Sequence, residues 1–221
     1  MSRQAEFQTQ SSNPTKIYLE WKSDDKCFAY YDKDKKENVK LELPMKFLTL
    51  MEFHTIKGWN DKNQSGVYSN EVKSIGQDEL NVRLFKGNQS VKGIYKEIKE
   101  SIVALGGHYT KSIYVMLEDG SIANINIKGS GVQSWGDFTQ KTRSRLSDEW
   151  IEVANAIELK KGKVNYSIPE FKFATSLNDS QSKMADDAYN KLKSYIDGYL
   201  SKQIEVKDEE LIDDNDISDL F

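Results

Sequence analysis

Cationic and aromatic side chains adjoin one another repeatedly along this 221-residue chain. A lysine or arginine can contact a phosphate, and an exposed aromatic ring can stack on an unpaired base. A surface that carries both can hold a single-stranded nucleic acid without reading its sequence. The residues in which the two types adjoin are Lys57, Trp59, Tyr68, Lys73, Arg83, Phe85, Lys86, Lys92, Tyr95, Tyr109, Lys111, Tyr114, Lys128 and Trp135. We predict that they form a nucleic-acid-binding surface.

Packing is the competing role for every one of these aromatic rings. Aromatic residues are favoured in strands, so each ring can belong to the core instead of the surface. Trp59, Tyr68 and Trp135 are the better candidates for stacking, because they stand next to glycines or polar loops, where a side chain is harder to bury. The sequence does not decide among the other rings.

The C-terminal segment 205–221, EVKDEELIDDNDISDLF, concentrates negative charge, with eight carboxylates against one lysine. Like charges at this density repel, and the segment has little apolar surface, so we expect 204–221 to be a disordered acidic tail. It closes on two bulky hydrophobes, which solubility alone does not require. We expect a peptide that docks on a partner protein and competes with an anionic ligand for a basic groove. The residues expected to bind the partner are Asp213, Asp214, Asp216, Asp219, Leu220 and Phe221.

The acidic tail dominates the net charge of the chain. The whole chain has 31 basic and 35 acidic residues and a net charge of −4. Without 205–221, 30 basic and 27 acidic residues remain, so the body is mildly basic. The acidic balance of the whole chain is therefore no argument against a nucleic-acid ligand.

Enzyme chemistry has little support in the sequence. His54 and His108 are the only histidines and Cys27 is the only cysteine, so a Cys/His zinc site is not available. The chain has no phosphate-binding loop of the G-x-x-x-x-G-K-[ST] type and no strand-linked G-x-G-x-x-G. We expect a protein without catalysis, cofactor or metal.

The periodicity of apolar residues predicts a mainly β fold with two or more helices. Expected strands are 16–22, 26–31, 39–44, 46–59 and 79–87, with hairpins over 111–129 and 150–173; 66–74 is expected to be turn-like, and helices are expected over 93–107 and 176–203. Short strands, glycine-marked turns and a helix between strands favour a Greek-key barrel of the OB type, with added N-terminal strands and a C-terminal helix. A β-sandwich is the alternative.

The expected organisation is a flexible N-terminus (1–15), one OB-like domain (16–203) and the acidic tail (204–221). No apolar run approaches the roughly 20 residues that a membrane span needs. The first residues lack the apolar core of a secretory signal, so we expect a cytoplasmic protein without a membrane partner.

The tail DDNDISDLF (213–221), together with the region 46–173 that holds FLTLMEFHTIKGW followed by GVYSNEV, resembles the single-stranded DNA-binding proteins of bacteriophages. Bacterial and phage members of this class end in an acidic run that closes on an aromatic residue. The resemblance implies an OB fold that coats single-stranded DNA in replication, recombination or repair, in the cytoplasm of the host cell if a phage encodes it. It also implies a tail that recruits polymerase, primase or helicase and lowers DNA affinity when no strand is bound.

One departure from the bacterial members concerns the linker. The expected helix over 176–203 runs almost directly into the acidic segment, without a Gly/Gln/Pro-rich stretch. This favours the compact phage type, and it leaves open whether the protein is a homodimer. The alternative function is that of an assembly or adaptor protein, in which the β-barrel binds protein and the tail is a docking peptide.

Overall fold

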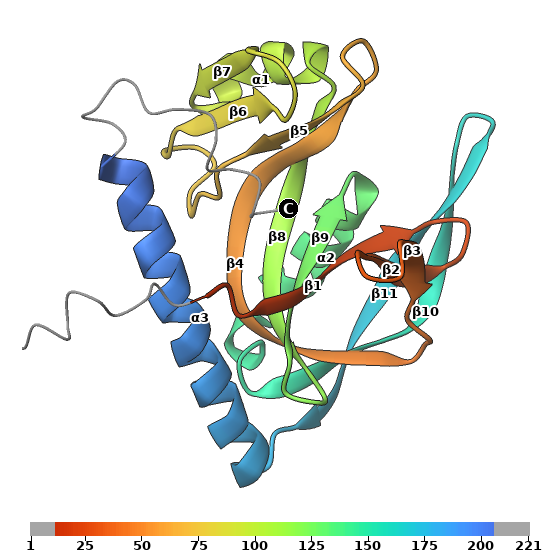
Figure 1. The fold of residues 1–221 in the computed structure, drawn as a ribbon. Helices are drawn as coiled ribbons and strands as arrows, with labels where there is room; N and C mark the ends of the chain where they lie inside the picture. The colour runs from red at the N-terminus through yellow and green to blue at the C-terminus, as the bar shows by residue number, and fades with distance from the viewer. Residues whose placement is uncertain (1–11, 206–221) are drawn as a thin grey trace, which may run out of the picture. The chain divides into compact units, whose positions relative to one another are not determined.

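The computed structural model describes residues 12–205 (Figure 1). In chain order the elements are β1 (Thr15–Lys22), β2 (Cys27–Asp32), β3 (Glu37–Lys40), β4 (Met45–Asn60), β5 (Ser65–Ser69), β6 (Leu80–Leu84), β7 (Ser90–Gly93), α1 (Tyr95–Ala104), β8 (Gly107–Leu117), β9 (Ile122–Lys128), α2 (Ser130–Gln140), a 3₁₀ turn (Arg143–Arg145), β10 (Glu149–Lys161), β11 (Val164–Ser176) and α3 (Asp179–Glu205). The predicted mainly β fold with two or more helices is confirmed. None of the described helices is both long and apolar enough to cross a membrane.

The chain divides into two compact units, and one boundary between them lies within α3. One unit comprises Thr15–Ala188, and the second takes in the helix from Tyr189 onward. The first unit holds all the strands described within residues 12–205, and therefore the sheet that they form.

Two short strands differ from the sequence-based expectation. The turn-like region begins with β5, and β7 was not expected at all. β7 has the sequence SVKG, in which Val91 is the one bulky apolar residue, so it has no alternation for a pattern to detect. Pairing with β6 makes it a strand.

The strands form one mixed sheet in the order β3-β2-β1-β9-β8-β4-β5-β6-β7. β10 pairs with β4 and with β11, and every pairing is antiparallel except that of β1 with β9. β11 hydrogen-bonds to β10 alone among the described strands, so the sheet is open.

β4 is the longest strand and links the parts of the sheet (Figure 1). Its first residues pair with β10, its middle with β8 and its last four residues with β5. A bulge lies between Thr49 and Met51, and such an extra residue bends a strand. β4 thereby extends beyond the central sheet and carries β5, β6, β7 and α1 on its end.

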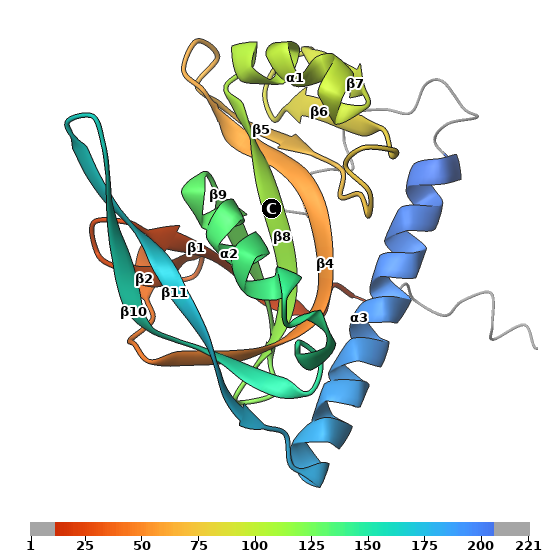
Figure 2. The same cartoon turned by 180° about the vertical axis from the view of Figure 1, so that it is seen from behind.

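Helices α1 and α2 lie on the same face of the sheet, which we call the helix face (Figure 2). α2 covers a core in which Trp135 packs with Phe47 and Phe171. α1 covers a second core, formed by Ile102 with the apolar residues of β5 and β6. Because side chains alternate along a strand, the neighbours of these core residues lie on the opposite face.

Candidate nucleic-acid interface

Four strands place one row of side chains in register on the face opposite α1 and α2. His108 of β8 pairs with Lys57 of β4, Lys57 pairs with Tyr68 of β5, and Tyr68 pairs with Arg83 of β6. Directly opposed residues of neighbouring strands project to the same face, at intervals of about 4.8 Å. We call the face that carries this row the polar face; it faces the viewer in Figure 1.

Two exposed aromatic residues extend the row at one end. Trp59 lies two residues after Lys57 and Phe85 two residues after Arg83, so both project from the polar face. The exposed fractions of their side chains are 53% and 51%, which are among the largest of the aromatic residues described. About half of the surface of each residue is therefore accessible to solvent.

Lys128 and Tyr18 lie at the other end of the polar face. Lys128 pairs with Thr110, two residues from His108 on β8, and its Nζ lies 2.9 Å from Glu20 Oε1. Tyr18 pairs with β9 at Asn124, and its ring centroid lies 5.5 Å from Lys57 Nζ, which is a cation–π distance.

The cations of the polar face differ in how far the protein neutralises them. Arg83 is exposed; its Nε donates to Asn81 Oδ1 at 3.3 Å, and no carboxylate among the described residues forms an ion pair with it. Lys92, on β7, lies 3.5 Å from Glu79. Of the two, Arg83 has the charge more available to a phosphate.

Lys57, a partly buried member of the row, interacts electrostatically with Glu71. Burial lowers the pKa of Lys57, and the charge of Glu71 opposes this shift. Burial raises the pKa of Glu71, although Ser112 and Tyr114 donate hydrogen bonds to its carboxylate. Both charged forms are therefore costly, and an added anion on this face would favour the protonated state of Lys57.

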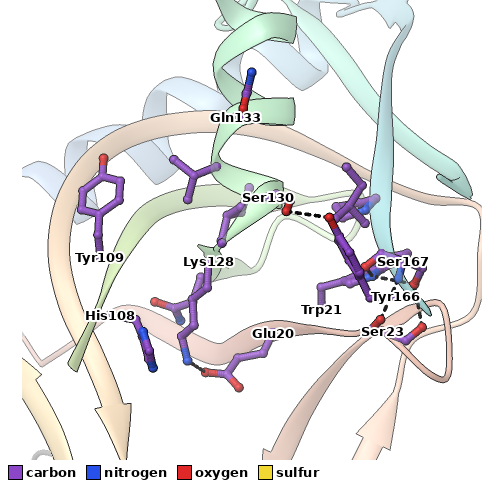
Figure 3. A pocket seen from close by; sticks show the side chains of 17 residues that line it. Glu20, Trp21, Ser23, His108, Tyr109, Lys128, Ser130, Gln133, Tyr166 and Ser167 are labelled. Carbon is purple, nitrogen blue, oxygen red and sulfur yellow. Dashed lines mark hydrogen bonds and ion pairs between the residues drawn. The ribbon is translucent and has the colours of Figure 1, made fainter. Parts of the chain in front are cut away.

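A pocket of about 800 Å³ adjoins the Lys128 end of the polar face (Figure 3). β1, β8, β9, β11 and the start of α2 form its walls. Ser130 Oγ and Tyr166 OH are hydrogen-bonded at 3.0 Å, and Trp21 Nε1 donates to the Ser167 carbonyl at 3.0 Å. The polar lining of the pocket thus includes these hydrogen-bonded groups and the Lys128–Glu20 ion pair.

Comparisons of the chain with protein-family models, with curated proteins and with solved structures find no match.

The structure brings together half of the residues predicted from the sequence. Those on the polar face with part of their surface exposed are Lys57, Trp59, Tyr68, Arg83, Phe85, Lys92 and Lys128. Tyr114 also projects to this face, but it is buried and its hydroxyl donates to Glu71. Lys73 and Lys86 lie in turns that follow β5 and β6.

The expectation that Trp135 is exposed was wrong. Its side chain is 2% exposed, and its Nε1 donates to Glu52 Oε1 at 2.6 Å. The neighbouring glycines suggested a loop, but they lie in and before α2, which turns Trp135 onto the sheet.

Three further predicted residues lie on the helix face. Tyr109 stacks on His54 with ring centroids 5.7 Å apart and contacts Tyr95, and burial raises the pKa of Tyr109 to about 12. Lys111 Nζ lies 3.2 Å from Glu52 Oε2, with 14% of its side chain exposed. The prediction that these residues share one surface with the polar-face residues was therefore wrong for Tyr95, Tyr109 and Lys111, because they pack within the fold on the other face.

Sequence reasoning missed Tyr18 and His108 as members of the polar face. The only signal for either was alternation, which gives a face within one strand but not which strands are neighbours. The predicted partner-binding residues from Asp213 to Phe221 lie outside the described residues. No cluster of three potential metal ligands occurs within the part of the chain that the structure describes.

Proposed function

We propose that this protein binds single-stranded DNA through its polar face, without catalysis. The observation that carries the proposal is the row His108–Lys57–Tyr68–Arg83 across four strands, flanked by the exposed rings of Trp59 and Phe85. Cations in line with exposed aromatic rings are what a single-strand groove requires.

The two residue types have separate roles in this proposal. Arg83, Lys57 and Lys128 contact phosphates, and the release of counterions makes the affinity fall as salt rises. Trp59, Tyr68 and Phe85 stack on bases, which is tolerant of sequence because every base has a flat face. The strand runs across the sheet from the β5–β6 end toward the pocket beside Lys128.

The order of the central strands supports an OB-type fold. β4, β8 and β9 are consecutive antiparallel neighbours, α2 follows, and β10 returns to pair with β4 before β11 pairs with β10. In an OB fold, strands two and three and the loops after strands one and four bind oligonucleotides. Here those positions correspond to β8, β9, the β5–α1 insertion and the β10–β11 turn, which surround the polar face and the pocket.

We further propose that the acidic segment has the two roles that its sequence suggests. Its charge competes with DNA for the polar face, and its terminal hydrophobes recruit replication proteins such as polymerase, primase or helicase. In this role the protein coats single-stranded DNA during replication, recombination or repair.

A fluorescence titration with oligo(dT) tests the proposal. The full chain and a chain ending at Ile212 are compared at low and high salt. Trp59 is exposed, Trp135 and Trp150 are 2% and 3% exposed, and Trp21 is half-buried beside the pocket. The larger part of the quenching should therefore come from Trp59 and be lost in Trp59→Phe. We expect salt-sensitive quenching that is stronger in the shorter chain. No quenching and no binding by either form would refute the proposal and favour the adaptor function.

A further inference from the structure

We propose that Trp59 and Phe85 form the walls of a slot that holds one unpaired nucleobase, with Gly66 as its floor. The inference rests on the proposed function and assigns it a specific subsite.

Strand pairing places Gly66 between the two aromatic residues. Trp59 pairs with Gly66 across β4 and β5, and the Phe85 N–H donates to the Gly66 carbonyl at 2.9 Å across β5 and β6. Two strand intervals separate the walls, which is about 10 Å between their backbones. Stacked bases lie about 3.4 Å apart, so one base between two rings needs about 7 Å, and this span accommodates it.

The floor of the slot is open. A Cβ atom built on Gly66 meets no heavy atom within 4 Å, and the backbone of Gly66 is not in the left-handed region. Neither close packing nor backbone conformation therefore requires glycine here. The space that a side chain would fill is the space that a base between Trp59 and Phe85 would occupy.

The surroundings of the slot indicate the chemistry of its ligand. Tyr68 lies two residues beyond Gly66 on the same face of β5, and Arg83 lies opposite Tyr68. The guanidinium of Arg83 lies two residues from Phe85, which suits a contact with the phosphate next to a base that stacks on the Phe85 ring. A base must be unpaired and unstacked to enter, so the slot selects single strands over duplexes.

The test variant is Gly66→Leu, whose side chain should fill the slot. The matched control is Gly76→Leu, because Gly76 lies in a turn between β5 and β6 and a Cβ built there also meets no heavy atom within 4 Å. Binding of the full chain is measured by fluorescence anisotropy with labelled oligo(dT) and with an abasic strand of the same length. We expect Gly66→Leu to weaken oligo(dT) binding by between about 5-fold and 150-fold, the range for one lost base stack. Binding of the abasic strand should not change, and Gly76→Leu should match the unchanged protein with both strands.

The outcomes separate the slot from the proposed function. If Gly66→Leu binds oligo(dT) as tightly as the unchanged protein, the slot is wrong while single-strand binding stands. If the unchanged protein binds neither strand, the proposed function itself fails. If Gly66→Leu melts earlier than the unchanged protein, Phe85→Leu decides, because it keeps apolar volume and removes the ring. A selective loss of oligo(dT) affinity in Phe85→Leu supports the slot, and no loss overturns it.

Discussion

Arg83 provides the sharpest test of the polar face. Its guanidinium is exposed, lies in register with Tyr68 and Lys57, and forms no ion pair with a described carboxylate. Replacing it with alanine should therefore remove one phosphate contact without breaking a salt bridge among the described residues. Lys99→Ala is the control, because Lys99 is an exposed cation of α1, and α1 lies on the helix face (Figure 2).

The size of the effect follows from counterion release. For single strands, the slope of log K against log salt changes by about 0.7 for each phosphate contact. At about 0.1 M salt, one contact therefore corresponds to roughly fivefold in affinity, or about 1 kcal/mol, relative to 1 M salt. Arg83→Ala should bind oligo(dT) about fivefold more weakly at about 0.1 M salt and equally well near 1 M.

The assay is fluorescence anisotropy of a labelled oligo(dT) over a salt series, with the slopes of the three proteins compared. We expect Arg83→Ala to flatten the slope by about 0.7 and Lys99→Ala to leave it unchanged. Equal slopes for Arg83→Ala and the unchanged protein would show that Arg83 contacts no phosphate. An equal loss in Lys99→Ala would show that binding depends on overall charge and not on the polar face.

Two further predictions concern stability. Gly58→Ala places a Cβ 2.1 Å from the Gly106 carbonyl oxygen, which belongs to the backbone and cannot turn away. We expect it to lose about 2–3 kcal/mol of unfolding free energy and to lower Tm by about 4–12 °C in calorimetry. Gly76→Ala should leave Tm unchanged, and a Tm of Gly58→Ala within a degree of the unchanged protein would contradict the close approach. Because burial raises the pKa of Glu71 in the folded protein, the folded protein keeps a proton that the unfolded chain loses near pH 4.5. The free energy of unfolding should therefore fall as the pH rises from about 4.5 toward the pKa of Glu71 in the folded protein. Urea denaturation should show Glu71→Gln gaining stability relative to the unchanged protein as pH rises above 4.5, and parallel pH profiles would refute it.

Local pattern predicted most of the elements. The alternation of Leu80, Val82 and Leu84 marks β6 and its buried side, and the double glycine after α1 marks the helix end. Each of these signals lies within a few residues of the chain, where side-chain period and turn chemistry act directly.

The interface was harder to predict because it depends on strand neighbours. Lys57 and Tyr68 lie close in sequence, but the row also needs His108, which joins through the pairing of β4 with β8. The error at Trp135 has the same origin: its glycine neighbours are local, whereas the sheet that buries it comes from strands far away in the chain. A single sequence carries no record of register between distant strands.

The parallel pairing of β1 with β9 sets an order of events during synthesis. Thr15 pairs with Ile122, so β1 leaves the ribosome roughly 100 residues before its partner strand exists. At about 5–20 residues per second, that interval is about 5–20 s. During it Leu19 and Phe28, both 0% exposed in the finished fold, have no β9 against which to pack. The nascent chain therefore exposes these apolar side chains and the unpaired edge of β1 until β9 emerges, and such a transient species is prone to aggregate.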